Sequence, residues 1–217
     1  MYQPPHFRED SLTVQHALIR EFPLGLLITI HQGVPVANPV PFLLYENDGK
    51  GVLRCHVARA NEQWQHINAG SPVLVVFQGV SRYITPSWYQ TKQDTGKVVP
   101  TWNYATVQVQ GAARVMDDGD WLLAQVNALT DQQEGKRQTP WKVSDAPDAY
   151  IASQFKGIIG IEIDISAIEG KWKVSQNRPE ADVAGVILGL SGDADSHENS
   201  DMLSLVKRYG LRTSELK

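Results

Sequence analysis

Short runs rich in β-branched and aliphatic residues are the feature that most restricts how this 217-residue chain folds. Six of them read LGLLITI, VPVANPVPFLLYE, GVLRCHVA, PVLVVFQG, RYITPS and WNYATVQVQGAARVM. Turn residues separate the runs, as in HQG, NDGKG, AGSP and QDTGK. A further run alternates Ile with Glu and Asp from Ile159 to Ile165, which is the period of a strand with one wet face. The pattern predicts six or seven strands.

Helical segments interrupt the strands, without the regular alternation of a doubly wound sheet. The first, REDSLTVQHALIREFP, has Asp10 or Ser11 as its cap and ends at Pro23. The others are NEQWQHIN, DDGDWLLAQVNALTDQQE, SDAPDAYIASQFKG and NRPEADVAGVILGL. In the last two, Pro147 and Pro179 stand near the first helical position. Strands joined mostly by short turns predict a mainly β fold, an antiparallel barrel with peripheral helices.

The composition fits a globular cytoplasmic protein. A hydrophobic content of 42% is enough for a core, and the net charge of −4 lacks the basic face of a dedicated nucleic-acid binder. Cys55 is the only cysteine, so a reducing compartment fits best. The N-terminus MYQPPHFRED has no apolar region of the signal-peptide kind. The apolar runs are far shorter than the roughly 20 residues of a membrane span, so no membrane segment is predicted.

Several motifs that are diagnostic of a particular type of active site are absent from the sequence. It has no GxGxxG opening a helix after a strand, no P-loop and no GxSxG elbow. The six histidines form no HxxxH pair, and with a single cysteine no zinc site is predicted. No helix-turn-helix with a basic second helix stands out.

The stretch CHVARANEQW, from Cys55 to Trp64, is a first candidate for anion binding. A strand is predicted to end near Val57, and Asn61 is a good N-cap for the helix that follows. Arg59 lies just before that cap, and a guanidinium beside free helix N–H groups suits a phosphate. The alternative is that Arg59 is a solvated surface charge and His56 an ordinary strand residue.

The stretch GKWKVSQNRPE, from Gly170 to Glu180, is a second candidate for anion binding. In an extended segment Lys171, Lys173 and Ser175 share one face, and Arg178 stands just before the next predicted helix. Hydroxyl, amide and guanidinium groups beside a helix N-terminus suit an anion. The alternative is an ordinary capping loop flanked by lysines.

Two similar aromatic units, ITPSWY and VPTWNY, stand a short polar stretch apart. Pro86 and Pro100 are predicted to mark strand ends, because proline cannot donate to a sheet ladder. Flat side chains with polar tips suit a planar ring, whereas the alternative is ordinary aromatic pairing across a hairpin. The aromatic residues concerned are Trp88, Tyr89, Trp102 and Tyr104.

Six motifs occur in one order: MYQPPHF, HVARANEQW, YITPSWY, VPTWNY, IEG and KVSQNR. They resemble the PaiB family of FMN-binding negative transcriptional regulators, from Met1 to about Leu190. The resemblance implies a flavin-type split β-barrel that forms homodimers, with FMN where two subunits meet. It predicts an FMN-binding split-barrel domain over residues 1–190. Outside the resemblance, the polar and acidic stretch from Gly192 to Asp201 indicates a linker, so residues 191–217 are predicted to be an acidic linker and a C-terminal helical tail. The chain departs from the family at ANPVPFLL, from Ala37 to Leu44, where members usually carry a His-Leu-Pro type of stretch.

The resemblance also implies which residues contact the cofactor. The FMN phosphate would be bound by Arg59, Asn61 and His56. The stretch GKWKVSQNRPE would add Ser175 and Arg178. The two aromatic units would line the flavin pocket or the subunit seam. The predicted cofactor-binding residues are therefore His56, Arg59, Asn61, Trp88, Tyr89, Trp102, Tyr104, Ser175 and Arg178. No catalytic or metal-binding residue is predicted.

The implied function is negative regulation of transcription by an FMN-binding dimer. DNA affinity comes largely from phosphate neutralisation, so an acidic chain needs a basic patch assembled across the dimer, or a protein partner. One alternative is an FMN-dependent oxidoreductase or flavin reductase, since a flavin carries its own chemistry and needs no catalytic motif. Another is a barrel that has lost its flavin and serves as a dimeric scaffold. The residues do not decide whether the chain is an enzyme.

Overall fold

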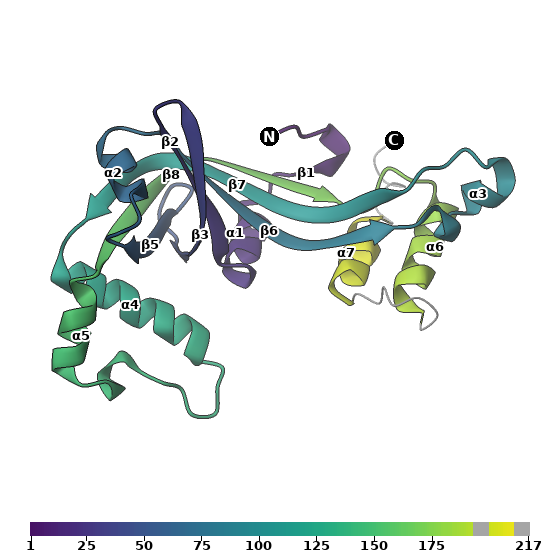
Figure 1. Ribbon diagram of the computed structural model, residues 1–217. Helices are drawn as coiled ribbons and strands as arrows, with labels where there is room; N and C mark the ends of the chain where they lie inside the picture. The colour runs from purple at the N-terminus through teal and green to yellow at the C-terminus, as the bar shows by residue number, and fades with distance from the viewer. Residues whose placement is uncertain (193–199, 211–217) are drawn as a thin grey trace. The chain divides into compact units, whose positions relative to one another are not determined.

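The computed structural model describes residues 1–192 and 200–210 (Figure 1). Its strands are β1 (Arg8–Glu9), β2 (Leu24–His31), β3 (Val34–Pro41), β4 (Leu43–Tyr45), β5 (Val52–Ala58), β6 (Val73–Ile84), β7 (Thr101–Met116) and β8 (Ile158–Lys173). Its α-helices are α1 (Leu12–Glu21), α2 (Gln63–Asn68), α3 (Gln90–Thr95), α4 (Gly119–Glu134), α5 (Asp148–Phe155), α6 (Glu180–Ser191) and α7 (Ser200–Gly210). Short 3₁₀ turns are η1 (Pro5–Phe7), η2 (Pro86–Trp88) and η3 (Val143–Asp145).

The strands form one sheet in the order β3-β2-β6-β7-β8-β5-β4, with β1 paired to β8. The pairs β2–β3, β2–β6, β4–β5, β5–β8 and β1–β8 are antiparallel. Strand β2 pairs with β3 over its whole length, from Leu24 opposite Pro41 to His31 opposite Val34. The predicted mainly β, antiparallel fold with peripheral helices is confirmed. Among the described helices, none is both long and apolar enough to cross a membrane.

The chain divides into two compact units. Unit one comprises Met1–Ser11, Gln78–Val107 and Glu169–Lys217, and unit two comprises Leu12–Phe77 and Gln108–Ile168. The long strands β6, β7 and β8 contribute residues to both. The predicted division of the chain at residue 190 stays a prediction. Most of the acidic linker predicted between Gly192 and Asp201 lies outside the described residues.

Each unit has its own core. In unit one, α6 and α7 lie side by side (Figure 1) and bury their apolar faces. The side chains buried there are Val183, Val186, Leu190, Met202 and Val206. In unit two, alternate residues of the strands point into the core, as the period of two requires. They include Leu27, Leu53, Val75, Phe77, Ile161 and Ile163.

Several elements differ from the prediction, each for a visible reason. The runs PVLVVFQG and RYITPS are a single strand, β6, continuous through Gly79. Strand β8 continues to Lys173, and β1 pairs with its far end, with Arg8 opposite Lys171. The predicted turn QDTGK is the end of helix α3, and Gly96 closes that helix in the left-handed conformation at φ 69°.

Candidate functional site

The junction after β5 consists of a tight loop and a short helix, α2. The Asn61 side-chain oxygen accepts from the Gln63 backbone N–H at 3.0 Å. Helix α2 begins at Gln63 with Glu62 in the N-cap position, so Asn61 lies one residue before the cap and the prediction of Asn61 as the N-cap is wrong. Trp64 Nε1 donates to the Arg59 carbonyl oxygen at 3.0 Å and holds the loop closed. Helix α2 has only six residues, so its N-terminus adds little to an anion site. Any anion binding here depends on the Arg59 side chain.

Arg59 is held by a carboxylate. Its Nη1 donates to Asp117 Oδ2 at 3.1 Å, and its Nη2 donates to Asp117 Oδ1. These hydrogen bonds raise the pKa of Arg59 and lower the pKa of Asp117, so the pair is fully charged at neutral pH. An incoming phosphate therefore has to share Arg59 with Asp117 or displace that carboxylate.

His56 points from β5 into a half-buried position. Its Nδ1 atom is shielded from solvent and has no hydrogen-bond partner among the described residues. Burial lowers the pKa of His56, so the imidazole is neutral at pH 7. A neutral imidazole offers an acceptor or a donor to a ligand but adds no charge for a phosphate.

Gln63, two residues after Asn61, is an organising residue that the sequence reading missed. It is fully buried, and its amide nitrogen donates to the Leu27 carbonyl at 3.0 Å and to the Val36 carbonyl at 3.1 Å. Its oxygen accepts from Asn38 Nδ2 at 3.0 Å. These bonds tie the start of α2 to β2 and β3, so the HVARANEQW motif has a structural role in addition to any binding role.

The second candidate stretch forms a small pocket in unit one, with a volume of about 70 Å³. Asn103 Nδ2 donates to the buried Ser175 hydroxyl at 2.8 Å, and Lys173 Nζ donates to the Trp102 carbonyl at 2.5 Å. Ser175 has a φ of 71°, the left-handed region that non-glycine residues seldom occupy. The pocket is lined by Thr101, Asn103, Lys173, Ser175, Asn177 and Arg178.

Two cations, Lys173 and Arg178, line this pocket, and a third, Lys171, is close enough for its charge to act on Lys173. Burial is the main reason that the pKa of Lys173 is lowered, and the charges of Lys171 and Arg178 lower it further. Lys171 is buried, and its ammonium lies 5.3 Å from the Tyr2 ring and 5.4 Å from the Tyr104 ring. Among the described residues, none of the three cations has a carboxylate as an ion-pair partner, and mutual repulsion therefore favours an anion there.

The four predicted aromatic residues have different surroundings within unit one. Trp88 packs on α6, where a methyl group added to Gly185 or Gly189 would collide with it. Tyr89 is buried, with the Arg178 guanidinium 4.4 Å from its ring centre. Trp102 is 56% exposed, and its ring meets Tyr83 edge-on at 6.1 Å. The prolines do mark strand ends, since Pro86 follows β6 by two residues and Pro100 directly precedes β7.

The residues predicted to bind the cofactor thus fall into two groups. His56, Arg59 and Asn61 belong to unit two. The other six belong to unit one, where Arg178 and Ser175 line one pocket and Tyr89 contacts Arg178. Their common role in binding stays a prediction. Lys171 and Lys173 join the unit-one group, and the shared strand face of Lys171, Lys173 and Ser175 was the sequence signal for them.

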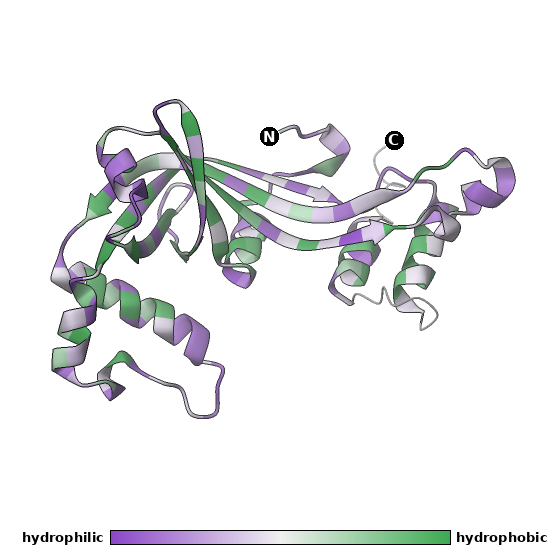
Figure 2. Ribbon diagram, in the orientation of Figure 1, coloured by the Kyte–Doolittle hydropathy of each residue, from purple (hydrophilic) through white to green (hydrophobic). Residues whose placement is uncertain are grey.

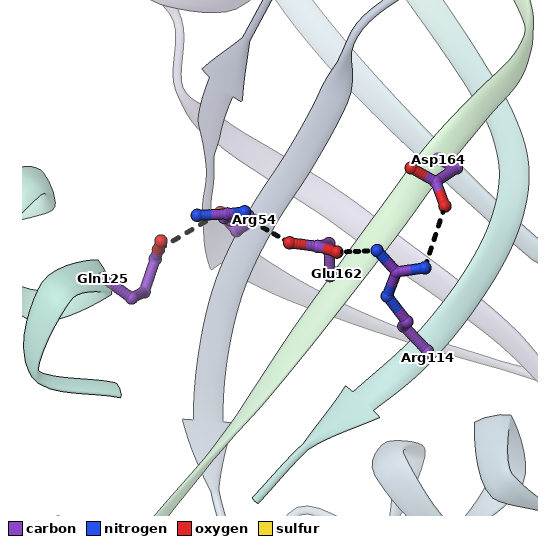
Figure 3. Close-up of polar contacts among 5 residues, drawn as sticks. All are labelled: Arg54, Arg114, Gln125, Glu162 and Asp164. Atoms are coloured by element: carbon purple, nitrogen blue, oxygen red, sulfur yellow. Dashed lines mark hydrogen bonds and ion pairs between the residues drawn. The ribbon is translucent and has the colours of Figure 1, made fainter. Parts of the chain in front are cut away.

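A network of charges in unit two was not predicted (Figure 3). Glu162, on the strand face expected to be wet, is only 3% exposed. Arg54 Nε donates to it at 2.5 Å, Arg114 Nη2 donates to its other oxygen, and Arg114 Nη1 donates to Asp164 at 3.2 Å. The expectation of a wet face is therefore wrong at Glu162. Because two arginines saturate this carboxylate, it holds β5, β7 and β8 together and is no free acid or base.

Within the described ranges, no three of the His, Cys, Asp and Glu side chains gather as metal ligands do. The single cysteine, Cys55, is buried, and burial raises the pKa of its thiol. A protonated, inaccessible thiol is a poor nucleophile and a poor metal ligand.

Comparison with known proteins decides the family. The family model described as "Putative FMN-binding domain" matches residues 1–167. This chain belongs to that family. The Bacillus subtilis protein named "Protease synthase and sporulation protein PAI 2" is 32% identical to it, across 89% of this chain and 90% of that protein. An uncharacterized protein of Emericella nidulans is 37% identical, across 88% of this chain and 90% of the relative.

A solved structure supports the fold. An FAD- and haem-binding protein from Mycobacterium smegmatis superposes with a TM-score of 0.58 at 15% identity, across 76% of this chain and 73% of that one. The predicted fold class, an antiparallel split β-barrel with peripheral helices, is confirmed. At this identity the likeness concerns the fold and carries no residue-level assignment.

Proposed function

We propose that this chain binds FMN and holds the FMN phosphate with Lys173, Ser175 and Arg178. Membership of a family described as FMN-binding supports the ligand. The residues are supported by the cations Lys171, Lys173 and Arg178, which have no carboxylate partner in the described part of the chain. Two of them line a pocket that also has hydroxyl and amide groups. This uncompensated cluster is the single observation that carries the proposal.

The chemistry of the cluster fits a phosphate. Burial and the neighbouring positive charges lower the pKa of Lys173. A phosphate dianion beside this lysine has the opposite effect on the pKa and stabilises the charged ammonium. Arg178 adds a guanidinium, which is suited to bidentate phosphate contacts. The exposed Trp102 ring offers a flat apolar surface in the same unit. When bound, FMN supplies the redox chemistry, and the protein supplies orientation and charge.

The residues of the other junction have a smaller role in this proposal. Asp117 already pairs with Arg59, so a phosphate has to share this arginine or displace the carboxylate, although an exposed pair of this kind is weak. His56 is neutral, and the Asn61 side-chain oxygen is already engaged by the Gln63 backbone N–H. We therefore place the main phosphate contact at Arg178 and a lesser one at Arg59.

A titration with FMN tests this ranking. We expect Arg178→Ala to weaken FMN binding about tenfold to hundredfold, because one or two charge-assisted hydrogen bonds are lost. Arg59→Ala should weaken binding by a smaller factor. Arg137→Ala is the matched control, since Arg137 is an exposed arginine paired with Glu134 on α4. The measurement is the change in flavin absorbance or fluorescence on titration.

Two outcomes would count against the proposal. Unchanged affinity in Arg178→Ala would remove the phosphate assignment. A wild-type protein that neither carries nor takes up FMN would remove the cofactor itself, and would favour the scaffold alternative.

We further propose that the FMN-bound protein is a homodimer that acts in negative regulation of transcription. The B. subtilis relative, whose name links it to protease synthesis and sporulation, supports a regulatory role. The net charge of −4 argues that DNA contact is indirect or confined to a local basic patch. We expect no gel retardation by the purified protein at physiological salt without a further protein. Retardation of a specific fragment by the protein alone would contradict this expectation.

The oxidoreductase alternative has a separate test. Anaerobic addition of NADH or NADPH to the FMN-loaded protein should leave the flavin spectrum oxidised if the role is regulatory. Rapid bleaching of the flavin band by either nucleotide would instead favour a reductase.

A further inference from the structure

One face of the unit-two sheet is apolar and uncovered. On β2, the residues Leu24, Leu26 and Ile30 are 64%, 37% and 37% exposed, and Ile28 lies between them on the same face. Figure 2 colours most of this strand as hydrophobic. Register extends the face onto both neighbouring strands. The "uncharged face" is the set Leu24, Leu26, Ile28, Ile30, Pro35, Ala37, Pro39, Pro41, Leu74 and Val76.

The sequence that builds most of this face carries no charge. From Phe22 to Tyr45 there is no Asp, Glu, Lys or Arg, although charged residues make up 20% of the chain. A solvated strand face normally alternates apolar residues with polar ones. Here the outward positions of β2 are aliphatic, and those of β3 are three prolines and an alanine. Such a face is typical of the core of a protein–protein interface, where charged residues are depleted.

We propose that the uncharged face is where two copies of this chain dock. Two-fold symmetry brings the same patch of both copies together, so a face without charges meets no like charge in its partner. This specifies the surface of the homodimer named in the proposed function, and it rests on that part of the proposal alone. It does not depend on flavin binding.

The size of the face agrees with this role. Strand β2 has eight residues, which span about 27 Å at roughly 3.4 Å each. Three strands about 4.8 Å apart are about 14 Å wide, so the face covers roughly 380 Å². A stable interface needs about 800 Å² from each partner. The uncharged face thus provides about half of that area, as an apolar centre that more polar surroundings complete.

The prolines favour face-to-face docking over strand addition. Strand β3 is at the edge of the sheet, and such an edge can pair with a strand from another chain. Pro35, Pro39 and Pro41 lack the N–H donors that a new ladder would use. The edge is therefore blocked while the face is open, and sheets that pack face to face are a common arrangement.

A lipid surface fits the uncharged face less well than a second copy of this chain does. Peripheral membrane surfaces combine apolar residues with Lys or Arg that meet anionic headgroups, and often with Trp or Phe. The hairpin Leu24–Pro41 contains none of these four residue types. The uncharged face therefore fits a like surface better than it fits a bilayer.

The experiment measures molar mass by light scattering after size-exclusion chromatography, as a function of concentration. We expect wild type at twice the 24.1 kDa chain mass. Leu26→Glu and Ala37→Lys should each raise the dissociation constant of the dimer at least about a hundredfold, because an unpaired charge is buried. Leu188→Glu is the control, since Leu188 is 74% exposed on α6 and should leave the dimer intact. Circular dichroism checks that each variant is folded.

Each outcome decides something. A wild-type monomer, or folded Leu26→Glu and Ala37→Lys variants that both stay dimeric, would overturn the proposal. A wild-type monomer that sediments with neutral phosphatidylcholine vesicles would assign the face to lipid instead. FMN titration of the same samples separates the two proposals, because a dimer that does not bind FMN leaves the uncharged face supported and the cofactor assignment refuted.

Discussion

Gly185→Ala is expected to destabilise the protein by about 1–3 kcal/mol, although the same change in an exposed helix interior usually stabilises by about 1 kcal/mol. The sign reverses because α6 packs directly on η2. A Cβ atom at Gly185 would come closer than 3.0 Å to the carbonyl oxygen of Trp88. Backbone of a neighbouring element cannot rotate away as a flexible side chain can, so α6 or η2 has to shift.

The measurement is the free energy of unfolding from urea titration. Gly119→Ala is the matched control, because Gly119 starts helix α4 and a Cβ there meets no atom of the described residues within 4 Å. It should be neutral or slightly stabilising. A Gly185→Ala variant as stable as Gly119→Ala would show that Trp88 does not rest on α6 as described. It would also return Trp88 to the set of aromatic residues free to contact a ligand.

Much of the fold could be predicted because its signals are local. Alternation of Ile with polar residues identified β8, and Pro86 and Pro100 correctly marked the end of β6 and the start of β7. The far end of β8 pairs with β1, about 160 residues away in the chain, and no local pattern reveals that pairing. Helix α3 was missed because its glycine cap looks the same as a turn in the sequence.

The sequence predicted which residue types belong to the candidate site, but it did not predict which of their charges are paired. The sequence placed cations at Arg59 and Arg178 in comparable junctions. The structure distinguishes them, because Asp117 pairs with Arg59 from 58 residues away. The partners of Trp88 and Glu162 likewise come from distant segments. Residue type shows which chemistry is available, whereas the state of each group depends on tertiary neighbours.

Glu162→Gln is expected to cost about 2 kcal/mol of stability at pH 7. The glutamine keeps the volume of Glu162 but removes the charge that two arginines share. Loss of one partner of a fully buried pair costs about 3–5 kcal/mol, and the smaller value applies here because the Arg54 and Arg114 side chains are 33% and 59% exposed. Arg54 also keeps its stacking on the Tyr45 ring, at 4.7 Å.

The pH dependence of this loss follows from the direction of the pKa shift. Burial alone would raise the pKa of Glu162, but Arg114 and Arg54 together outweigh it and lower the pKa below its usual value. A lowered folded-state pKa means that the stabilisation is complete above the unfolded pKa of about 4.3 and is lost as pH falls through the folded value. The stability difference between wild type and Glu162→Gln should therefore be constant from about pH 6 to 8, and should shrink below about pH 4.

Urea unfolding at several pH values measures this difference. Glu46→Gln is the control, because Glu46 is 65% exposed and its pair with Arg20 is screened by solvent, so no measurable loss is expected. A difference for Glu162→Gln that persists unchanged at pH 3 would mean that packing, not charge, accounts for the loss. Because the network joins β5, β7 and β8, a charge effect confined to Glu162 would identify this carboxylate as the group that holds the three strands of unit two in register.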